Sequence, residues 1–459
     1  MSRVERDSLG EVRVPAEAYY GAQTQRAIEN FHISGRRLQP GFIQAQGTVK
    51  KAAAIANTDL GLLDKKQGNA IVKAAQEVID GKLNDHFVID VYQMGAGTSQ
   101  NMNVNEVIAN RAIEILGGYK GNYSLVHPND HVNMAQSTND TIHVAMNIAA
   151  LMGVVEDLLP ALEGLQTALG KKASEFKGVV KIGRTHLQDA VPITLGQEFG
   201  AYDAAVEKAI NRVRNAADAL KELNIGGTAV GSGLNAHKEF PLLAIKEINS
   251  LTGQIFKRAE NYYEMGQNTL AALELSSALR YLAVVLGKIA NDLRFLSSGP
   301  RAGIGEITLP PVQPGSSIMP GKINPSMAEM LNMVCHQVIG NDASVASACQ
   351  GAQLELNVNM PVIAYNLLNS IEILANGITA FTEKCVKGIK ANEERCKELA
   401  EMSTALVTAL SPRIGYDEAA KLAREAFVRE KKIMDLVVEK GILSKEEAEE
   451  LLNPRKLVR

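Results

Sequence analysis

Three segments of the chain carry apolar residues spaced alternately three and four positions apart, at residues 206–220, 275–296 and 367–381. Residues with this spacing fall on one face of an α-helix, so each segment predicts a helix with a single apolar stripe. A lone helix would leave its stripe in water, and we therefore expect the three helices to pack side by side as a bundle. The stripe residues are Val206, Ile210, Val213, Ala217, Leu220, Leu275, Leu279, Leu282, Leu286, Ile289, Leu293, Leu296, Leu367, Ile371, Leu374, Ile378 and Phe381.

Polar, glycine-rich segments separate the predicted helices, and their composition does not suit helix interiors. Loops held on a rigid scaffold commonly carry functional residues, so we expect the site among these segments. They span residues 95–103, 127–140, 183–189, 226–235 and 298–325.

The last part of the chain changes in character. From about Glu393 it becomes charge-rich, and the stretch EKKIMDLVVEKGILSKEEAEELL predicts short, exposed helices. With a further boundary before the central helices, the sequence predicts three domains, at residues 1–136, 137–392 and 393–459.

Composition and charge narrow the class of protein. The chain has 459 residues, 46% of them hydrophobic, which is ample for a large buried core. Lysine and arginine total 48 against 51 acidic residues, and the net charge of −3 argues against a nucleic-acid groove. No apolar run reaches the ~18 residues of a membrane span, and the charged start MSRVERDSLG lacks the apolar core of a signal peptide. We therefore expect a cytoplasmic protein with no membrane or nucleic-acid partner.

The four cysteines lie in the last third of the chain, with no C-x-x-C spacing between them. So few cysteines do not form the disulfide framework of a secreted domain, and free cysteine usually behaves as a small hydrophobic residue. We expect reduced thiols in the core at Cys335, Cys349, Cys385 and Cys396.

The segment Gly315 to Asn324 reads GSSIMPGKIN and carries the most informative chemistry. It is not a nucleotide phosphate loop, because five residues separate the first glycine from the Gly-Lys pair and Ile323 follows Lys322. Its glycines permit a tight turn with N–H groups that converge on an anion. The segment could therefore hold a carboxylate and stabilise negative charge beside it. An ordinary surface loop with a solvated lysine fits the same composition.

Other motifs are weaker. Gly95-Ala-Gly97 lacks the third glycine of a dinucleotide fingerprint, and no G-x-S-x-G nucleophile elbow is present in the sequence. His127 and His131 are four residues apart, but Pro128 between them disfavours a helix that would align them for a metal. His186 lies among polar residues, where a hydrogen-bonded structural histidine is the simplest interpretation.

The segment GSSIMPGKINP resembles the signature of the fumarase/aspartase superfamily, in particular its class II fumarase and aspartase branch. The resemblance covers nearly the whole chain, because further segments are similar in the same order. They are ERDSLGEVRVPAEAYYGAQTQRAIENF, NMNVNEVIANRA, HPNDHVN, QSTND, GRTHLQDAVPITLGQEF, GGTAVGSGLN, SGPRAGIGEI and IGND.

This resemblance implies a mainly α, three-domain subunit whose long central helices form a bundle. Four such subunits join into a homotetramer with a twenty-helix core, and each active site takes residues from three subunits. The resemblance implies a small dicarboxylate substrate and no metal or organic cofactor.

The resemblance also assigns the site residues. Ser316 matches the catalytic base, Lys322 the cation beside the acidic carbon, His186 the active-site histidine, and Glu329 the carboxylate that orients it. The substrate-binding positions are Thr98, Ser137, Thr138, Asn139, Thr185, Ser317 and Asn324. A peripheral dicarboxylate site matches His127, Asn129 and Asp130.

The implied reaction is the reversible hydration of fumarate to malate, by anti elimination and addition through an aci-carboxylate. The alternative is the release of ammonia from aspartate. Thr138 and the segment GAGTS are more typical of aspartases. His127 within HPND, and Met360 where aspartases usually carry glutamate, are more typical of fumarases and favour hydration. A catalytically dead structural relative is a third possibility, and the intact Ser316, Lys322, His186 and Glu329 argue against it.

One segment and two single residues depart from the patterns of both fumarases and aspartases. TIHVA follows QSTND where a Phe-Pro-Thr stretch is usual, which leaves the start of the next helix undetermined. Met94 is bulkier than the small residue expected beside the site. Ser124 replaces a basic residue that the peripheral site often has, which weakens the expectation that a ligand binds there.

Overall fold

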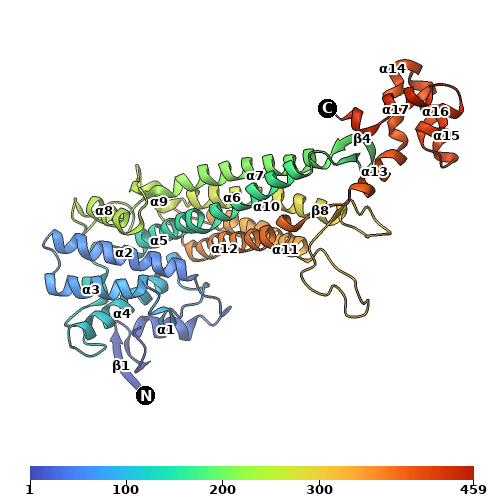
Figure 1. Cartoon of the computed structure of the whole chain (residues 1–459). Coiled ribbons are helices and arrows are strands. Elements are labelled where there is room, and N and C mark those ends of the chain that lie inside the picture. The colour runs from blue at the N-terminus through green and yellow to red at the C-terminus, as the bar shows by residue number, and fades with distance from the viewer. Residues whose placement is uncertain (459) are drawn as a thin grey trace. The chain divides into compact units, whose positions relative to one another are not determined.

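The chain is mainly helical, with 63% of its residues in helices, as the sequence predicts. The computed structural model in Figure 1 describes residues 1–458. The three helices expected from the apolar periodicity are α7 (Leu195–Asp218), α10 (Leu270–Leu296) and α12 (Met360–Lys384). The helices α6 (Leu159–Glu175) and α11 (Ser326–Gln350) are not predicted by that periodicity.

The residues form two compact units. The first unit comprises residues 1–160, 211–281 and 336–375, and the second comprises residues 161–210, 282–335 and the chain from residue 376 onward. Helices α7, α10, α11 and α12 supply residues to both units. The predicted division into domains 1–136, 137–392 and 393–459 stays a prediction.

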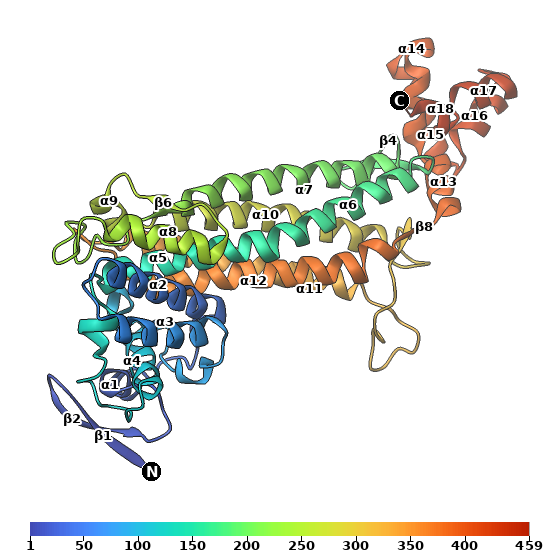
Figure 2. The same cartoon turned by 60° about the vertical axis from the view of Figure 1, so that its left-hand side comes forward.

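The first unit opens with an antiparallel hairpin that pairs Ser2 with Pro15, followed by helices that lie next to one another in Figures 1 and 2. Helix α5 continues through a π-helical turn, η4 (Gly153–Leu158), into α6. The other elements of this unit are β1 (Ser2–Asp7), β2 (Gly10–Pro15), α1 (Ala22–Asn30), α2 (Pro40–Asp59), α3 (Lys65–Ile79), η1 (Asn84–His86), η2 (Gly95–Gly97), α4 (Thr98–Ile115), η3 (Pro128–Val132), α5 (Thr138–Met152), η5 (Ala219–Lys221), β5 (Glu222–Leu223), α8 (Phe240–Thr252), β6 (Lys257–Arg258) and α9 (Tyr262–Gln267).

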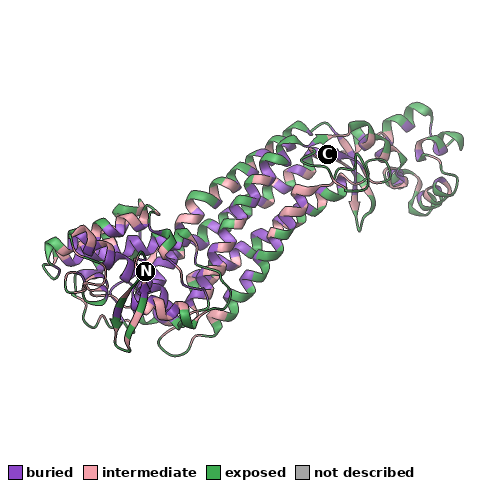
Figure 3. Ribbon diagram, turned by 90° about the horizontal axis from the view of Figure 1, so that it is seen from below, coloured by how far each residue is buried: buried purple, intermediate pink, exposed green. Residues whose placement is uncertain are grey.

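All residues of the three predicted stripes are buried, and none is more than 5% exposed. Figure 3 shows the resulting pattern, with buried and exposed positions alternating along each long helix. The apolar stripes are therefore already buried within a single chain. Large apolar side chains remain in solvent elsewhere on α10 and α11, where Val284, Phe295 and Met333 are 58%, 50% and 66% exposed.

In the second unit, two short pairings flank the long helices. The hairpin β3 (Val180–Thr185) and β4 (Gln188–Thr194) is antiparallel, and β7 (Ile307–Thr308) pairs antiparallel with β8 (Lys390–Ala391). The remaining elements are η6 (Val386–Gly388), α13 (Glu393–Met402), η7 (Thr404–Leu410), α14 (Ser411–Ile414), α15 (Tyr416–Val428), α16 (Ile433–Glu439), α17 (Lys445–Leu451) and α18 (Pro454–Leu457).

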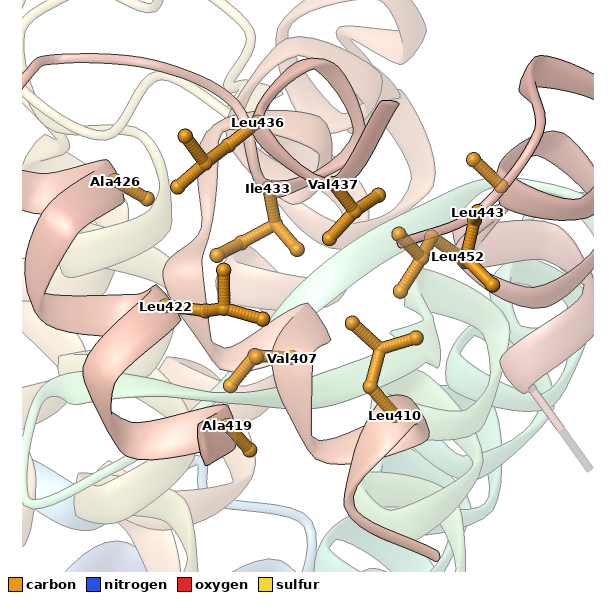
Figure 4. Close-up of a cluster of buried hydrophobic side chains, with 11 residues drawn as sticks. Val407, Leu410, Ala419, Leu422, Ala426, Ile433, Leu436, Val437, Leu443 and Leu452 are labelled. Atoms are coloured by element: carbon orange, nitrogen blue, oxygen red, sulfur yellow. The ribbon is translucent and has the colours of Figure 1, made fainter. Parts of the chain in front are cut away.

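The charge-rich end of the chain forms the short helices that the sequence predicts. They enclose a small apolar core of their own, in which Leu410, Leu436 and Leu452 are fully buried (Figure 4). Charged side chains stay on the outside and pair there, as Arg429 does with Glu439 at 2.6 Å. These helices are held together by burial of their apolar faces, because exposed ion pairs contribute little.

The cysteines are free thiols. Cys335, Cys385 and Cys396 are buried, and burial raises the pKa of each thiol to about 12. Cys349 is half-buried. A thiol with so high a pKa stays protonated and unreactive at neutral pH, as expected of small core residues.

Two helical segments are long and apolar enough to cross a membrane, residues 138–175 and 270–296. Within the fold, 67% and 44% of their most apolar windows are buried. Core helices commonly meet the same length and hydropathy criterion, so this finding does not by itself indicate a membrane protein.

Candidate active site

The predicted site residues divide between the two units. Thr98, the segment 137–139 and the peripheral positions belong to the first unit. Thr185, His186, the segment 316–324 and Glu329 belong to the second. Each set is built by a different local structure.

In the second unit, Ser316 lies on the long loop between α10 and α11, which Figures 1 and 2 show projecting from these two helix ends. Two hydrogen bonds close the neck of this turn. Gly315 N donates to Lys322 O at 2.8 Å, and Asn324 Nδ2 donates to Gly315 O at 2.6 Å. A Cβ at position 315 would lie 2.4 Å from Lys322 O, so only glycine fits there. The sequence prediction of a tight glycine turn is confirmed.

The turn directs N–H groups at the Ser316 hydroxyl. Ile318 N and Met319 N donate to Ser316 Oγ at 3.2 and 3.0 Å. Two donors on one oxygen favour its charged form, which is what a serine needs to act as a base. Lys322, on the same turn, is exposed and forms no ion pair with another described residue. The loop therefore presents a polarised hydroxyl and an uncommitted cation. Ser317 beside them is exposed.

Thr185 and His186 lie at the tip of the β3–β4 hairpin and are exposed. His186 and Leu187 have φ values of 54° and 60°, a conformation that non-glycine residues rarely adopt. Positive φ at both central residues of a two-residue turn matches the twist of the flanking strands, which explains why the strain is tolerated.

Buried ion pairs hold the base of this hairpin. Lys181 Nζ lies 2.8 Å from Glu198 Oε2 and 3.2 Å from Glu306 Oε2, and Arg184 Nη1 lies 2.9 Å from Glu306 Oε1. No motif or spacing in the sequence singles out Lys181, Arg184, Glu198 or Glu306. The segment GIGEI contains Glu306, but nothing in its spacing predicts the partner.

Glu329 lies in the first turn of α11 and is half-buried. Within residues 1–458, Glu329 and His186 form no hydrogen bond or ion pair with each other. One chain therefore does not make the predicted pair between them. That pairing stays a prediction.

In the first unit, the segment QSTND starts helix α5. Ser137 is the N-cap: its Oγ accepts from Asn139 N at 3.2 Å, while Ser137 N donates to Asp140 Oδ1 at 2.9 Å. This reciprocal capping box fixes the helix start at Thr138. The departure TIHVA, which left this start undetermined from sequence, is accommodated because Ile142, His143 and Val144 are all buried.

Asp140 also brings the loop at residues 226–235 to the same helix end. Gly226 N and Thr228 N both donate to Asp140 Oδ2 at 3.0 Å, and Asn139 Nδ2 donates to Ala229 O at 2.7 Å. Burial raises the pKa of Asp140 to about 6, an effect that the backbone donors partly offset. Both oxygens of the Asp140 carboxylate therefore serve to hold the helix start and the loop together.

Thr98 begins α4 directly after the short helix η2. Its loop is anchored by Ala96 N, which donates to Val358 O at 2.7 Å. Val358 lies two residues before Met360, so the Met360 segment adjoins the Thr98 loop. Met94, bulkier than expected, is 52% exposed at the edge of this loop.

Comparison with known proteins identifies the family of this chain. A family model described as "Lyase" matches residues 10–340, and one described as "Fumarase C C-terminus" matches residues 406–459. The chain belongs to the fumarase/aspartase lyase family. The recognition of the superfamily from sequence is thereby confirmed, as is the expected fold with long central helices.

Relatives of this lyase carry both activities in their names. A class II fumarate hydratase of Halobacterium salinarum is 55% identical over 452 residues, covering 98% of this chain and 96% of that protein. An aspartate ammonia-lyase of a Bacillus species is 52% identical over 452 residues, with coverage of 98% and 96%. The crystal structure of class II fumarase from Schistosoma mansoni has a TM-score of 0.96 at 40% identity, covering 100% and 99% of the two chains.

The peripheral positions of the lyase lie beside a cavity of about 410 Å³, and His127 and Asn129 line it. Glu106 and Arg6 also line it. His127 Nδ1 is occupied as a helix cap, since it accepts from Asn129 N and Asp130 N, each at 3.2 Å. Ser124 donates only to Asn122 nearby. Binding of a dicarboxylate here stays a prediction.

No group of three or more His, Cys, Asp or Glu side chains in residues 1–458 is arranged to hold a metal ion. His131 has a structural partner, because its Nδ1 accepts from His127 N at 2.8 Å.

Proposed function

We propose that this lyase interconverts fumarate and malate by reversible hydration. In the malate-to-fumarate direction, Ser316 Oγ removes a proton from the carbon next to one carboxylate. The resulting aci-carboxylate carries two negative oxygens, which Lys322 and Asn324 stabilise more than they stabilise the ground state. The hydroxyl on the neighbouring carbon then leaves as water after protonation.

The loop geometry supports this role for Ser316. Its hydroxyl already accepts two backbone N–H groups, at 3.2 and 3.0 Å, and the exposed Lys322 follows on the same closed turn. Both features lower the free energy of the serine oxyanion relative to the neutral hydroxyl.

The residues of the first unit suit the second carboxylate of the substrate. Thr98 and the segment 137–139 lie at the N-termini of α4 and α5. Helix N-termini present free N–H groups and a partial positive charge, which favour anions. We propose that the two sets of residues complete one another in a homotetramer, where His186 and Glu329 of different chains would meet.

The apolar side chain of Met360 is the main reason for proposing that water, and not ammonia, is the leaving group. It is fully buried at the start of α12, where aspartases usually carry glutamate. A leaving ammonium group needs an acceptor or a negative charge, and burying it without one costs several kcal/mol. Asp140 cannot serve, because backbone N–H groups occupy both of its oxygens. A hydroxyl leaving group needs only neutral hydrogen-bonding partners.

Aspartate ammonia-lyase activity is the second candidate. Thr138 and the sequence GAGTS at residues 95–99 favour it, as does the similar Bacillus enzyme of that name.

The deciding experiment supplies the purified enzyme with malate and with aspartate separately and follows fumarate by absorbance. We expect efficient fumarate formation from malate and little or none from aspartate. A Ser316→Ala preparation purified in parallel controls for contaminating host enzymes. Faster fumarate formation from aspartate would replace the proposal with the ammonia-lyase.

A further inference from the structure

A buried lysine lies beneath the predicted substrate-binding residues of the first unit. Lys50, on α2, is 1% exposed. Its Nζ donates to Asn101 Oδ1 at 2.9 Å, Asn133 Oδ1 at 2.9 Å and Gln136 Oε1 at 3.0 Å. An ammonium has three donors, and each has a partner here.

All three partners of Lys50 are neutral amides, which is unusual for a buried cation. Charged groups in a protein interior are normally paired with an opposite charge. Burial lowers the pKa of Lys50 to about 7, and the nearby charge of Asp140 opposes this shift. An apolar residue of similar size would fill the same space without the cost of burying a charge. The lysine therefore calls for an explanation other than packing.

The ammonium fixes which way each amide faces. Because it can only donate, its partners must turn their oxygens toward it and their NH₂ groups away. Gln136 Nε2 accordingly donates to Val132 O and Met134 O at 3.1 and 3.0 Å. Asn101 Nδ2 donates to Thr138 Oγ1 at 3.1 Å.

The hydrogen bond from Asn101 Nδ2 determines the orientation of the Thr138 hydroxyl group. Its hydroxyl oxygen accepts from Asn101, and within residues 1–458 the hydroxyl makes no other hydrogen bond. Asn101 cannot also accept the Thr138 proton, since its oxygen faces Lys50. The hydroxyl proton of Thr138 is therefore free for an acceptor outside this network.

We propose that Lys50 is a positioning residue that acts through the Asn101 amide to aim the Thr138 hydroxyl proton at a substrate carboxylate. The inference rests on the proposed function, which makes Thr138 a ligand of a dicarboxylate. Lys50 itself does not touch the substrate. Its hydrogen bonds to Asn133 and Gln136 also hold in place the turn that leads into Ser137.

The test measures binding of succinate, a dicarboxylate that cannot undergo elimination, to the assembled protein by calorimetry. Lys50→Met keeps the length of the side chain but removes the charge and the donors. We expect its succinate Kd to rise at least about tenfold, the effect of ~1.4 kcal/mol. The matched control is Lys51→Met on the same helix, whose Nζ instead contacts Gln76 Oε1 at 2.6 Å. Its Kd should stay within about twofold of the original, a change below ~0.5 kcal/mol.

A double variant separates positioning from general weakening. If Lys50 acts through Thr138, the Kd of Lys50→Met combined with Thr138→Val should hardly exceed that of Thr138→Val alone. The proposal would be overturned if the fold-increases in Kd of the two single variants multiplied in the double variant. A folded Lys50→Met protein that binds succinate normally would also overturn it.

Asn101→Asp provides a second route if Lys50→Met does not fold. It keeps an oxygen partner for Lys50 but places an acceptor opposite Thr138, so the hydroxyl proton should turn inward and succinate affinity should fall. Unchanged affinity, or failure of both variants to assemble, would reject the positioning role. An original enzyme that binds no succinate would instead contradict the proposed function, and an enzyme that prefers aspartate would leave the Lys50 test intact.

Discussion

Arg184 and Glu306 form a partly buried ion pair with 2.9 Å between Nη1 and Oε1, although 122 residues separate them in the sequence. Glu306 is fully buried, and its other oxygen lies 3.2 Å from Lys181 Nζ. Thr185 and His186 directly follow Arg184 in the hairpin. The pair therefore ties the predicted active-site histidine to the segment that leads to the Ser316 loop.

We expect Glu306→Gln to destabilise the protein strongly. The substitution leaves the half-buried Arg184 facing a neutral amide and leaves Lys181 with Glu198 as its one acidic partner. Loss of one member of a buried ion pair typically costs ~3–5 kcal/mol. The thermal unfolding midpoint should fall clearly, and turnover should fall at temperatures where the variant is still folded. Glu418→Gln is the control, because its partner Lys421 at 2.7 Å is 72% exposed. Equal midpoints for the two variants would contradict this role of Glu306.

Ser316→Ala should fold and assemble normally but lose most of its turnover, since the change removes the base and leaves a small residue in the turn. Loss of general base catalysis commonly lowers rates by ~10²–10⁴-fold. Succinate affinity should change much less than kcat. Ser297→Ala is a suitable control, because that hydroxyl donates only to Arg294 O on its own helix end. Near-normal turnover in Ser316→Ala would remove Ser316 from the role of base.

Mixtures of two inactive variants should regain activity if the site is shared between chains. His186 and Glu329 do not pair within one chain, and Ile318 at the tip of the Ser316 loop is 83% exposed, as expected of a surface that meets another subunit. After dissociation and joint reassembly of Ser316→Ala with His186→Asn, up to about a quarter of sites should contain both intact residues in a symmetric tetramer.

The control for this experiment is each variant reassembled with itself, which should stay inactive. Mixed tetramers that form and show no recovered turnover would place Ser316 and His186 of each site on the same chain.

His143 should make stability depend on pH. Burial lowers its pKa from 6.5 to about 4, because the side chain is 1% exposed and its Nε2 has no partner. The unfolded chain therefore binds more protons between these values, and stability rises with pH there. The contribution is complete above pH 6.5 and is lost as pH falls toward 4, by roughly 3 kcal/mol per chain at ~1.4 kcal/mol for each pKa unit.

The measurement compares thermal midpoints of the original protein and His143→Gln at pH 7 and pH 4.5. Glutamine stays neutral, so the midpoint of the original protein should fall more on acidification. His237→Gln, at an exposed position, should follow the original protein. A difference between His143→Gln and the original protein that does not change with pH would show that His143 is not buried in its neutral form.

The sequence determined the local structure well. Apolar spacing identified the long helices α7, α10 and α12 and their buried stripe residues, because a helix repeats every 3.6 residues whatever surrounds it. The glycines of the segment GSSIMPGKIN predicted the turn that holds Ser316, since their conformational freedom is intrinsic. The superfamily followed from motifs along nearly the whole chain, and the comparisons confirm it.

Only the tertiary structure decided how these parts are supported. Lys50 stands beside Lys51 in a helix, and nothing in the letters KK distinguishes a buried ammonium from a solvated one. Its partners Asn101 and Gln136 lie 51 and 86 residues away, and the partner of Arg184 lies 122 residues away. Such contacts depend on how helices and loops pack against one another, and no local spacing rule encodes that packing. The sequence therefore predicts which groups carry the chemistry, while the fold decides which buried charges hold them in position.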